Sequence, residues 1–131
     1  MGTEEARSKL HIARSHLERV SVASWDPPDP EEAVTWAFYA YENAVVAAAE
    51  ILGLPWEKNH YSKARLAKKL HERGKVSRDL SSELLKLNDL RKDVAYGEPG
   101  QELEEIDLED LVVELEEFVD EVAVLIEGAG P

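Results

Sequence analysis

PEEAVTWAFYAYENAVVAAAEIL, residues 30–52, is the stretch that decides the fold. Its apolar residues recur three and four positions apart, which places them on one face of an α-helix. These residues are Val34, Ala37, Phe38, Tyr41, Val45, Ala48 and Leu52. Alanine is plentiful on the other sides, so neighbouring helices can approach closely from several directions. We therefore expect residues 30–52 to form the central helix of the protein.

The rest of the chain repeats this helical periodicity, and no stretch alternates apolar and polar residues as a strand would. Further helices are expected over about residues 3–22, 62–73, 77–96 and 107–127. Short connections that contain proline or glycine separate them, which favours antiparallel neighbours. The prediction is an all-α fold, an antiparallel bundle of about five helices, in a single domain over residues 1–131.

Composition excludes several classes of protein. The chain contains no cysteine, so a disulfide framework and a thiolate metal site are excluded. Its first twenty residues are charged throughout, and its longest apolar run, Ala44–Ala49, is far too short to cross a bilayer. No metal or cofactor is expected, because the common metal and phosphate-loop motifs are absent. We expect a soluble cytoplasmic protein with no membrane association.

Charge is distributed unevenly along the chain. Residues 98–131 contain 13 acidic residues and no Lys or Arg, which equals the whole net charge of -13. Residues 58–92 contain 11 basic residues against 4 acidic ones. The two regions could complement each other inside one bundle. Alternatively, the basic segment could be a functional surface that the acidic C-terminal helix, about residues 107–127, borders or screens.

The basic helix offers candidate contacts to the phosphates of an RNA. These candidates are Lys63, Lys68, Lys69 and Arg73, together with Lys58 and Arg65. Trp56 and Tyr61 lie nearby in sequence and could stack on unpaired bases. The alternative is that these charges only keep a surface helix soluble.

The segment LNDLRKDVAYGEPG, residues 87–100, places an arginine on an apolar helix face. At 100° per residue, Arg91 lies about 20° from Leu80 and Asn88 about 80° from it, within the leucine arc. An isolated guanidinium is costly to bury, so Arg91 needs a carboxylate, a polar cleft or another subunit. Glu42 is the best candidate for a carboxylate partner within the chain. A snorkelling or salt-bridged arginine with no further role is the alternative.

Three segments together resemble the HEPN domain family: AFYAYENAVVAAAEILG (37–53), HYSKARLAKKLHERGKV (60–76) and LNDLRKDVAYG (87–97). The core of the resemblance spans about residues 31–97. It implies an all-α protein that dimerises through its helical faces. The family includes toxins that cut RNA and non-cutting members that accompany minimal nucleotidyltransferases.

The signature of this family is an arginine, usually followed by a polar residue, with a histidine after four to six intervening residues. Arg91 and Lys92 match its first part, but Tyr96, Gly97 and Glu98 occupy the three places for the histidine. In toxins of the family, a tyrosine two residues beyond the histidine can be adenylylated by the partner, and Glu98 stands there. The resemblance places Arg91 in a cleft between subunits, for which Glu42, Asn88 and Lys92 are the other candidate residues.

The missing histidine matters for catalysis. Cleavage of RNA without a metal needs a group that moves a proton near neutral pH, which suits an imidazole and not a phenol with a pKa of about 10. His60 and His71, at the ends of the basic segment, are interpreted as solvated or capping residues. We therefore expect a non-cleaving, dimeric binding or regulatory module, with an RNA, a nucleotide or a nucleotidyltransferase as partner in a toxin–antitoxin-like system.

Two alternatives stay open. One is a metal-independent endoribonuclease, in which Arg91 stabilises the phosphorane and Tyr96 or a histidine from elsewhere moves the proton. The other is a plain helical interaction protein.

Overall fold

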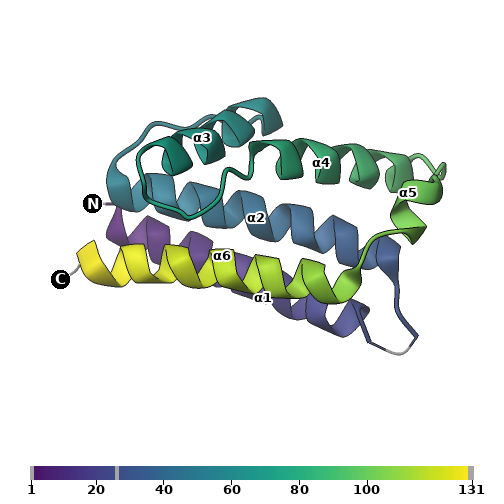
Figure 1. The fold of residues 1–131 in the computed structure, drawn as a ribbon. Helices are drawn as coiled ribbons and strands as arrows, with labels where there is room; N and C mark the ends of the chain where they lie inside the picture. The colour runs from purple at the N-terminus through teal and green to yellow at the C-terminus, as the bar shows by residue number, and fades with distance from the viewer. Residues whose placement is uncertain (1, 26, 130–131) are drawn as a thin grey trace.

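A computed structural model describes residues 2–25 and 27–129, and these residues form helices and no strand. The helices are α1 (Thr3–Ala23), α2 (Pro30–Leu52), α3 (His60–Glu72), α4 (Ser81–Ala95), α5 (Gln101–Glu104) and α6 (Leu108–Ala129) (Figure 1). The prediction of an all-α bundle is confirmed. Its five helices correspond to α1, α2, α3, α4 and α6, and α5 is a short addition.

Helix α2 has clear start and stop signals. The Asp29 side chain caps its first turn by accepting a hydrogen bond from the Glu32 amide at 3.2 Å, and Pro30 is the first helical residue. Gly53 ends the helix in the left-handed conformation, with φ of 70°. This backbone conformation is cheap for glycine and strained for other residues, so the helix stops here.

Helix α2 is the centre of the bundle. It packs against α1, α3, α4 and α6, and Figure 1 shows it between α1 and α6 on one side and α3 and α4 on the other. Its buried face combines large residues with alanines that let the other helices approach. The largest fully buried side chains of the core are Tyr41, Phe38, Leu70, Leu80, Leu87 and Leu115.

Some helix boundaries differ from those predicted. Helix α3 begins at His60 because the Asn59 side chain caps it, accepting from the Ser62 amide at 2.7 Å. Helix α4 begins at Ser81, after Asp79 accepts from the Ser81 amide at 2.9 Å. Helix α5 was not predicted, because its single buried apolar residue, Leu103, gives no periodic pattern.

The basic and acidic regions meet at the connection between α3 and α4 and not along the length of α3. Helix α3 packs on α2 and α4, whereas α6 packs on α1 and α2. Within the described residues, the ion pair between these regions joins Arg78 to Glu114 at 3.5 Å. The side chains of Lys68, Lys69 and Arg73 are exposed. In the described part of the chain, no helix has both the length and the apolar character that a membrane span needs.

Candidate functional site

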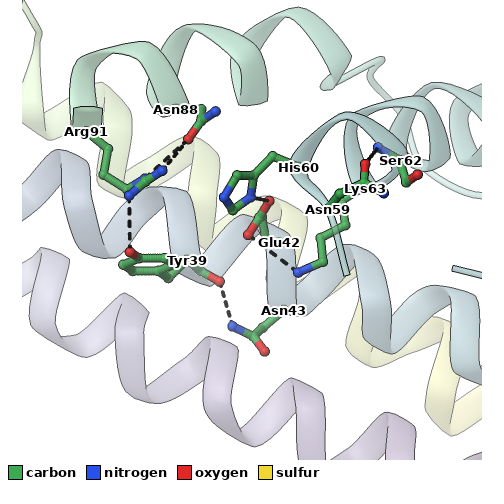
Figure 2. Close-up of polar contacts among 9 residues, drawn as sticks. All are labelled: Tyr39, Glu42, Asn43, Asn59, His60, Ser62, Lys63, Asn88 and Arg91. Carbon is green, nitrogen blue, oxygen red and sulfur yellow. Dashed lines mark hydrogen bonds and ion pairs between the residues drawn. The ribbon is translucent and has the colours of Figure 1, made fainter. Parts of the chain in front are cut away.

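The guanidinium of Arg91 lies on α4 among neutral groups from α2 and α4. Nε and Nη2 donate to Oδ1 of Asn88 at 3.2 and 2.7 Å, and Nη1 donates to the Tyr39 hydroxyl at 3.5 Å (Figure 2). Its Cζ atom lies 5.1 Å from the centroid of the Phe38 ring and 5.7 Å from that of Tyr39. Both rings present their faces to the cation, which is a favourable arrangement. Arg91 itself is half-buried.

The expected ion pair between Arg91 and Glu42 is not formed, and that expectation was wrong. Glu42 bonds to His60 and Lys63, and no carboxylate within 4.0 Å pairs with Arg91 among the described residues. The angular position of Glu42 turns its side chain toward α3, which the sequence could not place relative to α4. Among the described residues, no neighbouring carboxylate therefore compensates the positive charge of Arg91.

Glu42 is a buried carboxylate with an imidazole and an ammonium group as neighbours. Its side chain is 5% exposed, and Oε2 lies 2.7 Å from Nδ1 of His60, while Oε1 lies 3.6 Å from Nζ of Lys63. A carboxylate can only accept, so Nδ1 of His60 carries the shared proton. The His60 side chain is 40% exposed, and its other ring nitrogen, Nε2, is the one left for a ligand. The structure thus joins α2 and α3 through a carboxylate–imidazole pair (Figure 2).

His60 and Arg91 meet on the same aromatic ring. The His60 ring contacts Phe38 edge to face, with centroids 5.1 Å apart, and the Arg91 guanidinium lies at the same distance from Phe38. The two side chains are therefore no further apart than twice that distance. Three helices contribute to this cluster: Phe38, Tyr39 and Glu42 from α2, His60 from α3, and Arg91 with Asn88 from α4.

The remaining candidate residues lie around this cluster or apart from it. Lys92 is exposed beside Arg91, and Tyr96 directly follows α4 with 76% of its surface exposed. Lys63 is half-buried and pairs with Glu42, so it is not free for a phosphate, whereas Lys68, Lys69 and Arg73 are exposed. These three exposed residues remain candidate phosphate contacts, and their exposure is the observation that supports them.

The two aromatic residues proposed for base stacking differ. Tyr61, which follows His60, is 72% exposed and presents an open ring. Trp56 is half-buried, its indole donates to Glu50 at 2.7 Å, and Lys9 and Lys63 lie over its ring. Trp56 therefore serves the packing of this end of the bundle, and Tyr61 is the better stacking surface.

Sequence reasoning missed His60 as the partner of Glu42. The usable signal was a glutamate inside an alanine-rich helix, which needs a cationic or hydrogen-bonding partner when buried. The choice among His60, Lys63 and Arg91 required the packing of α3 against α2. That packing depends on the connection over residues 53–59, for which the sequence has no periodic pattern.

The described residues thus form an all-α bundle, and neutral side chains hold an arginine on its fourth helix. A sequence model of the HEPN domain family matches residues 3–125. The match covers nearly the whole chain, including the flanking helices outside the core of the resemblance, and the chain belongs to the HEPN family. Comparisons with curated proteins and with solved structures return no significant match.

Proposed function

We propose that the chain is a dimeric HEPN module that binds phosphate groups of an RNA or a nucleotide at Arg91. The observation that supports this is the neutral setting of its guanidinium. Asn88 and Tyr39 orient the group without cancelling its charge. A half-buried cation oriented in this way is suited to a charge-assisted hydrogen bond with an anion from outside the chain. Phosphate is the anion we propose, because members of this family act on RNA and because α3 carries exposed basic side chains that could contact further phosphates.

The signature pair of Arg91 and Tyr96 does not cleave RNA in this proposal. A phenol is a poor proton acceptor near neutral pH, and Tyr96 is exposed at the end of its helix. The role of these two residues is binding or regulation. Tyr61, with its open ring, adds a surface on which an unpaired base stacks.

A binding experiment tests the phosphate site. Arg91→Ala should weaken the binding of a short fluorescent single-stranded RNA at least tenfold in an anisotropy titration, because it removes a charge-assisted contact of about 1.5–3 kcal/mol. Arg14, exposed on α1, provides the matched control, and Arg14→Ala should bind almost as wild type. Competition by a mononucleotide tells whether RNA or a nucleotide is preferred. Equal loss in both variants would mean that binding is general electrostatics and not a site.

Dimerisation has a separate test. Arg91 is half-buried and has no carboxylate within 4.0 Å among the described residues, which leaves room in the proposal for a second subunit to complete its cleft. Size-exclusion chromatography with light scattering should therefore return twice the monomer mass at micromolar concentration. A monomer at that concentration would remove the shared cleft from the proposal and leave a single-chain site.

A nucleotidyltransferase-type protein is the partner that the family suggests. Its place in a toxin–antitoxin-like pair is tested by the neighbouring coding sequence and by co-purification. A stable complex with a minimal nucleotidyltransferase encoded next to this chain would support it. An absence of such a neighbour would reduce the proposal to the RNA or nucleotide site.

A further inference from the structure

A groove with a volume of about 690 Å³ lies between α1 and α2, beside the turn that joins them. Val22, Ala23 and Pro27 form its apolar wall, and Arg19 and Trp36 also line it. Val22 is 70% exposed, so this wall is open to water. Sites for small organic ligands have volumes of this order and a mostly apolar lining. The α1–α2 groove is therefore large enough for a planar group such as a nucleobase.

Aromatic rings and cations form a continuous line from this groove to Arg91. The Arg19 guanidinium lies 4.2 Å from the centroid of the Trp36 ring, and this ring lies 6.0 Å from that of Tyr39. The Tyr39 ring in turn lies 5.7 Å from Cζ of Arg91. Arg91 and Trp36 are thus no further apart than the sum of the last two distances, which a dinucleotide can span. The groove and the phosphate site of the proposed function are neighbours on one surface.

Packing alone explains part of this line but not Arg19. The indole of Trp36 donates to Glu32 at 2.7 Å and the His16 ring lies on it at 4.9 Å, so these contacts fix α1 against α2. Arg19, in contrast, is exposed and forms no ion pair among the described residues, although carboxylates line the same groove. It presents a flat cation at the mouth of the groove. Unpaired bases of RNA stack on guanidinium planes and on aromatic rings.

The carboxylates of the groove indicate which part of an RNA enters it. Glu18, Asp29 and Glu32 line the groove, and their charge disfavours a phosphate there. Asp29 and Glu32 already accept hydrogen bonds from the chain, whereas Glu18 is exposed and pairs with no cation among the described residues. A carboxylate only accepts, so it selects a ligand with N–H donors. Guanine presents two neighbouring N–H donors on its Watson–Crick edge.

We propose that the α1–α2 groove binds a base of single-stranded RNA, guanine in particular, while a neighbouring phosphate of the same strand lies at Arg91. This inference rests on the proposed function, since it extends the Arg91 site by a second subsite. The base stacks on Arg19 above Trp36 and donates to Glu18. The arrangement favours an oligonucleotide over a mononucleotide, because a strand occupies both subsites at once.

Substitutions of Arg19 test the base subsite with little risk to the fold, because this side chain is exposed. In an anisotropy titration with a fluorescent uracil pentamer that carries one central guanine, Arg19→Ala should weaken binding at least about fivefold. Arg19→Lys should weaken it nearly as much, since lysine keeps the charge but has no planar surface on which a base stacks. Arg7, exposed on the same helix, provides the matched control, and Arg7→Ala should bind almost as wild type.

An RNA with an abasic residue in place of the guanine separates the base from the backbone. Wild type should bind it as weakly as Arg19→Ala binds the intact RNA, and Arg19→Ala should bind both RNAs equally, because the base and Arg19 act together. Full binding by Arg19→Lys, or equal weakening of both RNAs by Arg19→Ala, would overturn the base subsite. The proposed function would still stand if Arg91→Ala weakened both RNAs. A wild type that binds neither RNA would overturn both.

Discussion

Asn88 holds the guanidinium of Arg91 with one oxygen atom, at 3.2 Å from Nε and 2.7 Å from Nη2. Both residues belong to α4 and are separated by one helical turn, so the backbone fixes their spacing. Asn88 is buried, and its amide orients the cation without neutralising it. In the proposed function this arrangement matters because it leaves the charge of Arg91 uncompensated by a carboxylate and open to a phosphate.

Asn88→Asp tests that distinction with almost no change of shape. The carboxylate would pair with Arg91 and cancel the charge that a phosphate would meet. RNA affinity should fall at least tenfold, while the free energy of unfolding changes by less than about 1 kcal/mol, because the attraction and the cost of burying the carboxylate oppose each other. Anisotropy and urea denaturation measure the two effects. If Asn88→Asp binds RNA as tightly as wild type, Arg91 does not contact the phosphate.

Glu42→Ala should destabilise the fold, because it leaves Lys63 half-buried without its carboxylate and creates a space in the core. The expected loss in the free energy of unfolding is about 2–3 kcal/mol. It lies at the lower end of the range for buried pairs, since His60 is partly in water. Glu42→Gln keeps the volume and should cost clearly less. Equal costs for the two variants would mean that the charge, which both of them remove, and not packing sets the role of Glu42.

The sequence was sufficient for the fold because the deciding signals are local. The cap at Asp29, the stop at Gly53 and the apolar spacing within α2 each act over a few residues, and the structure has them as expected. The uneven distribution of charge was also evident from the sequence, but whether the acidic helix covers the basic one was not. Whether α6 covers α3 depends on which faces of α2 they occupy, and these alanine-rich faces look alike in sequence.

The site was predictable only in part, for the same physical reason. The angular positions placed Asn88 beside Arg91 on the leucine arc, and in the structure the Asn88 oxygen accepts from the Arg91 guanidinium. Tyr39 and His60 come from other helices, so their contacts depend on interhelical packing. Whether Glu42 pairs with His60 or with Arg91 depends on how α2 is rotated about its axis relative to α3 and α4.

The ion pair between Arg78 and Glu114 tests how far the acidic helix supports the basic region. Both side chains are about two-fifths exposed, at 41% and 43%, so water screens their attraction. Glu114→Gln should therefore lower the free energy of unfolding by less than about 1 kcal/mol, and high salt should remove most of the difference. A loss well above that value in urea denaturation would mean that complementary charge between the two regions holds the bundle together.

His16 should make the stability of the protein depend on pH. Burial, and next the positive charge of Arg19, hold the pKa of this imidazole below its ordinary value. Its ring stacks on Trp36 at 4.9 Å, and its buried Nδ1 has no hydrogen-bond partner among the described residues. The folded state thus favours the neutral ring, and the unfolded state binds the proton more readily.

The sign follows from this difference. The contribution of His16 to stability is complete above the unfolded pKa of about 6.5 and is lost as pH falls through the lower pKa of the folded state. His16→Phe keeps a ring on Trp36 and removes the titrating group, so its free energy of unfolding should fall less steeply than that of wild type between about pH 7 and pH 5. The other histidines are common to both proteins, and the difference between the two curves isolates His16. Parallel curves from urea denaturation across this range would contradict the assignment.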